Sequence, residues 1–321
     1  MESRESYPLV TIGIPTYNRA NGYLKLALGS ALAQTYPNLE IIVSDNCSTD
    51  NTQSLVESYA DPRVKYVKQD PQVSANENFN ACLNTANGEY FLLLHDDDLI
   101  DADFVETCMR QANYRTDYGV IRTGTRRIDA NGNTISENKN RVGGLPVSEF
   151  FIGWFDKLTS VYLCSTLFNT RKLKEIGGFQ SKTQVFQDAV ALVKLASKYG
   201  RIDVVDVKAS YRNHEAQNTH AVKVMAWVED SMYLLDIMCE LEKDNSARIR
   251  SKGSKFFSKL NYRRASVINS LVERWKINLF IYRLFNFHYS PLDDWYETEV
   301  LPRLHRVRFR IKSIMGAQLK Y

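Results

Sequence analysis

Short apolar segments alternate with segments of helical spacing through the first hundred residues of this 321-residue chain. The apolar segments carry β-branched and aliphatic residues on consecutive positions, which is typical of strands covered on both faces of a parallel sheet. Four such strands are expected, at residues 8–15, 39–44, 64–67 and 90–94. Three helices are expected between them, at residues 20–33, 50–59 and 76–86. This order predicts an α/β fold, with a doubly wound sheet flanked by helices.

The alternation becomes less regular after residue 101. Further strands are expected at residues 120–128, 161–168 and 204–211, and a further helix at residues 187–199. From residue 220 onward the pattern is helical, so we place a domain boundary there. The sequence therefore predicts an α/β domain over residues 1–219 and a mostly helical C-terminal extension over residues 220–321.

Charge is divided between these two parts of the chain. The composition, with 44% hydrophobic and 24% charged residues, is that of an ordinary globular protein. Residues 246–321 carry 16 Lys and Arg against 5 Asp and Glu, whereas the residues before them carry 25 against 32. A basic extension of this kind indicates contact with anionic lipid, nucleic acid or an acidic protein surface.

The cellular location is inferred from segments that the sequence lacks. The first residues are polar and do not resemble a secretory signal. No apolar run approaches the ~18–20 residues of a membrane span. The five cysteines are scattered, without the spacing of a zinc site, and are expected to be buried reduced thiols. The sequence predicts a cytoplasmic protein, which is compatible with peripheral attachment to the inner face of the cell membrane.

A run of acidic residues follows the apolar strand at residues 90–94. The run is His95-Asp96-Asp97-Asp98, and ligands of open α/β sheets bind beyond the carboxyl ends of such strands. Adjacent carboxylates repel one another unless a cation relieves them, and Mg²⁺ and Mn²⁺ prefer oxygen ligands. A metal there would stabilise a departing diphosphate. The alternative is that Asp98, Asp101 and Asp103 only cap the helix that follows.

Four motifs follow one another in residues 8–215. They are VTIGIPTYNR at 10–19, QTYPNLEIIVSDNCSTD at 34–50, NGEY leading into HDDD at 87–98, and GGF followed by QD at 177–188. In order and spacing these motifs resemble those of the family 2 glycosyltransferases. The resemblance implies a nucleotide-binding domain of the GT-A type. It also implies a single displacement that inverts the anomeric centre of the transferred sugar.

The resemblance implies a set of donor contacts. The residues expected to cradle the nucleotide are Pro15, Thr16, Tyr17 and Asn18. Asp45 would accept a hydrogen bond from a uracil or thymine N–H, so the expected donor is a UDP- or dTDP-sugar. Asp96 would face the ribose or the sugar. Asn80 belongs to the same set, although the arginine often found before its equivalent is Phe79 here.

The resemblance also implies a metal site. Asp97 would be the principal ligand of Mn²⁺ or Mg²⁺, with Asp98 close by. The first acidic position of the family's motif is His95 here, which shifts the acidic run toward residues 96–98. A later segment ending in His214 resembles the one in which a basic residue reaches the diphosphate or the metal. A neutral imidazole is a competent Mn²⁺ ligand, and an ordinary polar role is the open alternative.

Asp188 is the candidate general base. It lies at the start of the helix expected at 187–199, after the glycine-rich segment, where it would take the proton of an attacking sugar hydroxyl. The resemblance implies the same role, and Gln187 in place of a second acid leaves Asp188 as the one carboxylate. The alternative interpretation of Asp188 is a plain helix N-cap.

The basic extension has two candidate contact segments. Residues 301–312 alternate Arg and Lys with aliphatic residues, which favours an amphipathic contact with an anionic membrane surface. Residues 275–289 mix aromatic and basic residues, which suits a membrane contact, a homodimer contact or simple packing. Nucleic acid is a poorer explanation for the charge because no recognised binding motif is present.

The sequence as a whole predicts a metal-dependent, inverting glycosyltransferase. Its acceptor is expected to be a glycan or a lipid-linked saccharide. A nucleotidyltransferase would need a glycine-rich, basic phosphate loop after the first strand, and the segment from Pro15 to Asn18 is not one. A non-catalytic module that binds a nucleotide sugar or a glycan remains the alternative.

Overall fold

One mixed sheet organises the larger part of the protein. The computed structural model describes residues 7–214, 223–301 and 303, and these residues form a nine-stranded sheet. The strands are β1 (Val10–Thr16), β2 (Leu39–Asp45), β3 (Val64–Lys68), β4 (Tyr90–Leu93), β5 (Leu99–Ile100), β6 (Val120–Ile128), β7 (Thr134–Asn138), β8 (Thr166–Asn169) and β9 (Arg201–Arg212). Their spatial order is β3-β2-β1-β4-β8-β6-β9-β5, with β7 paired to β6. The first four strands are parallel, and β8 runs against both β4 and β6.

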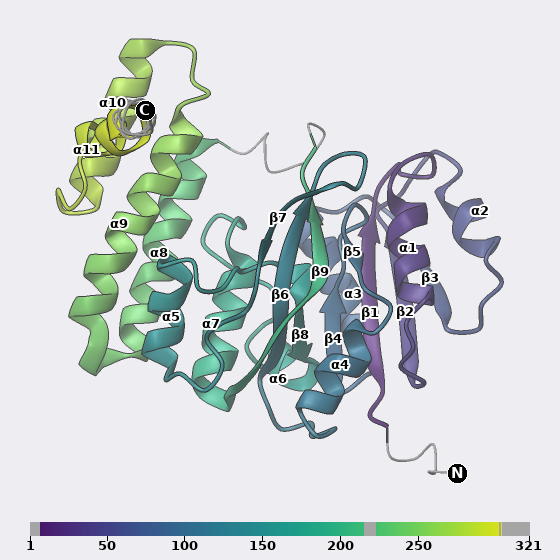
Figure 1. Ribbon diagram of the computed structural model, residues 1–321. Coiled ribbons are helices and arrows are strands. Elements are labelled where there is room, and N and C mark those ends of the chain that lie inside the picture. Colours follow the sequence, from purple (N-terminus) through teal and green to yellow (C-terminus); the bar gives the residue numbers. More distant parts are fainter. Residues whose placement is uncertain (1–6, 215–222, 302, 304–321) are drawn as a thin grey trace, which may run out of the picture.

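Helices cover both faces of this sheet and form the C-terminal extension (Figure 1). They are α1 (Leu24–Leu32), α2 (Thr52–Glu57), α3 (Ala75–Thr85), α4 (Phe104–Gln111), α5 (Val147–Phe155), α6 (Thr170–Glu175), α7 (Gln187–Tyr199), α8 (Val224–Leu241), α9 (Ser246–Ala265), α10 (Leu271–Leu284) and α11 (Pro291–Trp295). Single 3₁₀ turns lie at Leu163–Ser165 and Lys243–Asn245, and a π-helical turn at Tyr296–Val300.

The alternation of side chains along the strands builds two hydrophobic cores. On β2, Ile41 and Val43 join the core beneath α1, α2 and α4, whereas Ile42 between them joins the core beneath α3 and α5–α9. On β4, Leu92 and Phe91 are divided in the same way. Successive side chains of a strand point to opposite faces, so a strand buried on both faces must be apolar at every position. This confirms the α/β fold predicted from the consecutive apolar residues.

The helical extension packs on the α/β domain through aromatic side chains. Phe257 of α9 is fully buried, and its ring lies 6.0 Å from Trp154, 5.9 Å from Phe155 and 5.8 Å from Phe186, measured between centroids. One hydrophobic cluster therefore runs from the sheet through α5 and α7 into α8 and α9. Figure 1 shows these helices side by side at one end of the sheet. The predicted boundary between residues 219 and 220 falls outside the described residues.

Some elements were not predicted from the sequence. The residues of β7 are mostly exposed and polar, and β5 has two residues. Helix α5 (VSEFFIGWF) is buried around almost its whole circumference, so it lacks the amphipathic spacing by which a helix is recognised. Within the described ranges, no helix is long and apolar enough to cross a membrane. All five cysteines are free thiols, and Cys47 is the one that is not fully buried.

Phe257→Ala tests the packing of the extension. The substitution removes a buried ring from the shared core, so we expect it to lower the free energy of unfolding by about 3–5 kcal/mol. Phe280→Ala on α10 is the matched control, because Phe280 is 45% exposed and its loss is expected to change stability by about 0.5 kcal/mol or less. Urea unfolding of both variants checks this. Equal stabilities would show that α9 does not pack on the α/β domain in solution.

Candidate active site

The loops after β1 and β2 lie against each other at one edge of the sheet. Thr16 and Asp45 are register partners at the ends of these two strands, and the amide of Asn46 donates to the carbonyl of Thr16 at 2.9 Å. The Asn18 side-chain oxygen accepts from the amide of Thr49 at 2.9 Å. These bonds fix the segment from Pro15 to Asn18, which is expected to cradle the nucleotide, beside Asp45. Tyr17 in this segment is 43% exposed.

Asp45 is buried at the end of β2, and both of its oxygens have partners. Oδ1 accepts from the amide of Ser48 at 2.9 Å, and Oδ2 accepts from the hydroxyl of Tyr66 at 2.5 Å. Tyr66 lies on β3, so the loop after β2 and the neighbouring strand together hold this carboxylate in one orientation. Each carboxylate oxygen accepts more than one hydrogen bond, which leaves Asp45 able to bind a further N–H donor.

Asp96 connects the acidic run to the loop after β1. Its Oδ2 accepts from the Thr16 hydroxyl at 2.8 Å and lies 4.0 Å from Nε of Arg19. Burial and the neighbouring charge of Asp97 raise the pKa of Asp96 to about 6, against the opposing effects of Thr16, Arg19 and His214. The structure thus brings together Thr16 and Asp96, which the sequence analysis assigned to the same donor.

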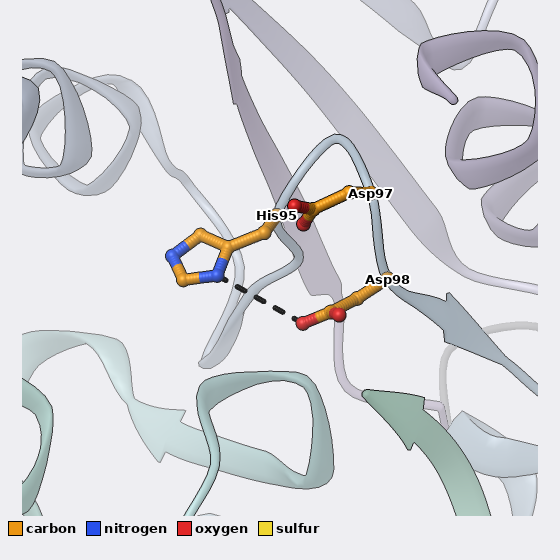
Figure 2. Close-up of side chains that lie close together, drawn as sticks. All are labelled: His95, Asp97 and Asp98. Carbon is orange, nitrogen blue, oxygen red and sulfur yellow. Dashed lines mark ion pairs between the residues drawn. The ribbon is translucent and has the colours of Figure 1, made fainter. Parts of the chain in front are cut away.

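The acidic run and a histidine from the end of β9 form a cluster of metal-binding groups. Donor atoms of His95, Asp97 and Asp98 lie within 4.8 Å of one another, and Figure 2 shows all three on the loop after β4. His95 Nδ1 is turned toward Asp98 Oδ2, at 3.8 Å. The fourth group is His214, whose Nε2 lies 2.9 Å from Asp97 Oδ2.

The chemistry of this cluster fits a divalent cation. Two ligands at right angles on one ion, with bonds of about 2.1 Å, stand about 3 Å apart, which matches the 2.9 Å between Asp97 and His214. Burial raises the pKa of Asp98, and the charge of Asp97 adds to the increase. Nε2 of His95 is buried and has no hydrogen-bond partner among the residues that the structure describes, and burial lowers the pKa of this ring.

Arg212 fixes the acidic run to β9. Its amide donates to Oδ1 of Asp98 and its Nε donates to the carbonyl of Asp97, both at 2.9 Å. Its guanidinium lies over the ring of Tyr23, 4.5 Å from the centroid, and donates to the carbonyls of Asp129 and Ala130. Arg212 is therefore the residue through which β9 holds the loop after β4 and presents His214 to Asp97.

Asp188 lies in the first turn of α7. The N-cap of this helix is Phe186, so the alternative interpretation of Asp188 as an N-cap is wrong. Its side chain is partly exposed and makes no hydrogen bond to another side chain in the described part of the chain. Burial raises the pKa of Asp188 to about 6, the backbone amides of the helix start oppose this, and Asp230 adds to it.

Tyr162 is near enough to both Asp98 and Asp188 for their charges to act on it. Burial raises the pKa of its hydroxyl, and the charges of both Asp98 and Asp188 contribute to the increase. Its ring stacks on that of Tyr211 at 4.5 Å between centroids. The charges of the acidic cluster and of Asp188 thus both act on the Tyr162 hydroxyl.

The glycine-rich segment before α7 is fastened to α3 by Asn80. The Asn80 side-chain oxygen accepts from the amide of Phe179 at 2.9 Å, and its nitrogen donates to the carbonyl of Phe179 at 3.1 Å. Gly178 has φ +76°, and a Cβ there would lie 2.3 Å from the Asn80 oxygen, so glycine is required. These contacts give Asn80 a part in fixing the glycine-rich segment, while its expected contact with the donor stays a prediction.

Other contacts of the site were not identified from the sequence. His95 was noted as a departure from an acidic motif and was given no role, although it lies within reach of Asp97 and Asp98. Tyr66, which orients Asp45, lies in a strand with no distinguishing pattern. His95 contacts Asp98 within one loop, three residues further on, whereas Tyr66 contacts Asp45 from the neighbouring strand and is 21 residues away in the chain.

Comparison with protein families identifies a family model that matches just over half of the chain. The model of "Glycosyl transferase family 2" matches residues 11–177. An uncharacterized glycosyltransferase of Rickettsia typhi is 31% identical over 226 residues, which cover 68% of this chain and 69% of that protein. The chondroitin synthase of Escherichia coli is 32% identical over 197 residues, or 59% of this chain. The chain spans 26% of the length of that synthase.

Solved structures resemble the whole described fold. S. aureus TarS 1–349, solved in complex with UDP-GlcNAc, has a TM-score of 0.60 at 16% identity, with 90% of this chain and 91% of that chain covered. The mannosyltransferase PcManGT from Pyrobaculum calidifontis, solved with GDP-Man and Mn²⁺, has a TM-score of 0.55 at 18% identity, with 90% and 85% covered. At these identities the likeness shows the fold alone, and it confirms the predicted GT-A-type sheet with a helical C-terminal region.

Proposed function

The chain belongs to the family 2 glycosyltransferases, and on that premise we propose that it moves a sugar from a UDP- or dTDP-sugar to a glycan acceptor with inversion. The observation that carries the proposal is a pair of carboxylate sites whose charges both act on Tyr162. One is the acidic cluster with His214 near Asp97, and the other is Asp188 with its raised pKa.

The donor is proposed to bind along the loops after β1, β2 and β4. Asp45 accepts an N–H of the base, Tyr17 and its neighbours cradle the nucleotide, and Asp96 faces the ribose or the sugar. The Thr16–Asp96 hydrogen bond supports this, because it joins the two loops that would hold the nucleotide and the sugar. The complex of TarS with UDP-GlcNAc, on the same fold, supports a uridine nucleotide.

Asp97 and His214 are proposed to hold a divalent cation, with Asp98 beside them. Mn²⁺ is favoured over Mg²⁺ because the set includes an imidazole. When bound, the cation offsets the charge that builds up on the leaving diphosphate. The presence of Mn²⁺ in the PcManGT complex, and the 2.9 Å between Asp97 and His214, support this assignment.

Asp188 is proposed to be the general base. The acceptor hydroxyl oxygen forms a bond to the anomeric carbon as the bond from that carbon to the diphosphate oxygen breaks, and the hydroxyl proton passes to the Asp188 carboxylate. The diphosphate leaves with the bonding electrons. A pKa of about 6 suits this role, because the group is ionised at neutral pH and is a stronger base than an ordinary aspartate.

The acceptor is proposed to be a polysaccharide or a lipid-linked saccharide. Similarity to the chondroitin synthase of Escherichia coli supports a polysaccharide, over the part of that synthase that the chain spans. A non-catalytic module that binds a nucleotide sugar is the second candidate. The raised pKa of Asp188 favours the enzyme, since a module that only binds its ligand has no use for a base poised near neutrality.

Asp188→Asn tests the catalytic role. Loss of the base is expected to lower the turnover number for release of UDP from UDP-sugars by about 10²–10⁴-fold, with the affinity for UDP unchanged. In the wild type, kcat/KM is expected to rise with pH through about 6 and then level off, because protonation of Asp188 below its pKa removes the base.

Glu175→Gln is the matched control for this substitution. It makes the same change from acid to amide at an exposed residue of α6 that pairs with Arg171 at 3.2 Å, and full activity is expected. Asp96 also has a pKa of about 6. Because Asp96 is proposed to contact the donor, the affinity for UDP measured as a function of pH distinguishes its titration from that of Asp188. Full turnover in Asp188→Asn would exclude Asp188 as the base.

Asp97→Asn tests the metal site. We expect the affinity for Mn²⁺, measured by calorimetry in the presence of UDP, to fall at least about tenfold, because the principal ligand loses its charge. Asp101→Asn is the matched control, since Asp101 is four residues further on and pairs with Arg126 at 2.6 Å. Equal Mn²⁺ affinities in the two variants would contradict the assignment of Asp97.

Peripheral membrane contact is proposed to involve α10. This helix buries Ile281 and partly buries Ile277 and Leu284 on one side, and its opposite side is apolar and exposed. Leu271, Val272, Trp275 and Leu279 line a shallow hollow there together with Lys276, and their side chains are 56–66% exposed. We call this surface the α10 face. The residues first expected to bind lipid, 301–312, lie almost entirely outside the described residues.

Charge favours an anionic lipid surface as the occupant of the α10 face. Lys276 and Arg283 flank the apolar residues, and Glu273, the one acid of this helix, is on the other side by helical spacing. A two-fold contact with a second copy would set Lys276 and Arg283 against the same two basic residues. Negatively charged lipid headgroups would instead attract Lys276 and Arg283, and a tryptophan such as Trp275 is typical of the membrane interface.

Leu279→Ala tests the α10 face. We expect its affinity for vesicles of phosphatidylglycerol and phosphatidylcholine to fall about tenfold, because each buried CH₂ contributes about 0.8 kcal/mol. Lys276→Glu is expected to weaken binding as well, most strongly at low salt. Leu26→Ala is the matched control, because Leu26 is 51% exposed on α1 at the far end of the sheet. Co-sedimentation that is equal in all the variants would contradict this proposal.

A further inference from the structure

A buried carboxylate of the helical extension holds the segment that leads to Asp188. Asp230 of α8 is fully buried. It accepts four hydrogen bonds, all from residues 181–186. The Ser181 hydroxyl donates to Oδ2 at 2.6 Å, the amide of Thr183 to Oδ1 at 2.9 Å, and the amides of Val185 and Phe186 to Oδ2 at 2.8 and 2.9 Å.

This segment has no helix or strand of its own, and it joins two parts of the site. At one end the amide of Phe179 is held by Asn80 of α3. At the other end Phe186 is the N-cap of α7, and Asp188 follows two residues later. Three of the four donors to Asp230 are backbone amides, so the contact sets the path of the main chain and not only the position of a side chain.

Other groups of the extension close the segment from outside. The Thr183 hydroxyl donates to the carbonyl of Ala226 at 2.8 Å. The guanidinium of Arg264 lies 3.4 Å from the centroid of Trp227 and 5.4 Å from that of Phe186. The segment therefore contacts both α8 and α9, and a shift of Asp230 would move the start of α7.

We propose that Asp230 is a positioning residue for catalysis: by holding residues 181–186 it sets the place of Asp188 relative to the donor. The helical extension is then a part of the acceptor side of the active site. This inference rests on the proposed function, in which Asp188 is the base. A displacement of about 1 Å at a reacting group is enough to lower a rate about 10²-fold.

Asp230→Asn is the central variant. An asparagine keeps one acceptor oxygen and turns an NH₂ donor toward amides that are donors themselves, so the segment cannot keep all its bonds. With UDP-GlcNAc and Mn²⁺, and with water as the acceptor, we expect kcat for UDP release to fall about 10²-fold while KM for the donor is unchanged. Ser181→Ala removes one of the four bonds, leaves the three amides paired and is expected to give a smaller loss.

Glu229→Gln is the matched control. Glu229 is the neighbour of Asp230 on α8 and pairs with Lys182 of the same segment at 3.5 Å, but on the surface. It makes the same change of charge and touches none of the backbone amides, so full kcat is expected. The melting temperature of each variant shows that it is folded.

A double-mutant comparison separates positioning from a general loss of structure. If Asp230 acts through Asp188, then Asp230→Asn will not lower the residual rate of Asp188→Asn any further. A loss by the same factor in both backgrounds would overturn the proposal, as would full kcat in folded Asp230→Asn.

Amide hydrogen exchange gives a readout that does not depend on turnover. Asp230→Asn is expected to speed exchange in residues 181–190, and Glu229→Gln is not. Unchanged exchange in Asp230→Asn would overturn the inference. The exchange rates of the two variants could differ as expected while the wild type releases no UDP. That result would count against the proposed function, and not against the contact of Asp230 with residues 181–186.

Discussion

The parallel pairing of β1 with both β2 and β4 is the constraint on which the site depends. Parallel strands end at the same edge of a sheet, so the loops after these three strands must meet. The register sets Thr16 beside Asp45, and it aligns Gly13 with Leu93 so that the acidic run begins next to the last residues of β1. The hydrogen bond from Thr16 to Asp96 then joins groups that are 80 residues apart in the chain.

Uncompensated negative charge gives this edge its chemistry. Burial raises the pKa values of Asp96 and Asp98, and the charge of Asp97 adds to the increase. A divalent cation would offset the negative charge of these carboxylates. Asp188 obtains a similar shift on its own helix, so one fold holds two carboxylate sites, for which we propose separate tasks. The extension contributes to the second of them through Asp230, and it is thus more than an appendage.

The parts of the molecule that the sequence predicts are those with local signals. Strands buried on both faces have consecutive apolar residues, so β1, β2 and β4 were predicted within one or two residues. Helix α5, buried on nearly all sides, gives no such signal. In the site, the motifs located the residues whose roles are now proposed. They did not indicate that Tyr66 orients Asp45 or that Asp230 holds the segment before Asp188, because those contacts join residues 21 to 49 positions apart.

A nucleotide panel tests the central claim most directly, namely a metal-dependent site for a nucleoside diphosphate at the carboxyl ends of β1, β2 and β4. Thermal unfolding of the wild type would be followed with UDP, dTDP, GDP and CMP, each with and without Mn²⁺. A ligand that binds the folded state stabilises it by about 2.7 kcal/mol at a hundredfold excess over Kd. The account predicts a rise in melting temperature with UDP or dTDP that requires Mn²⁺. No rise with any nucleotide, in folded protein, would contradict it.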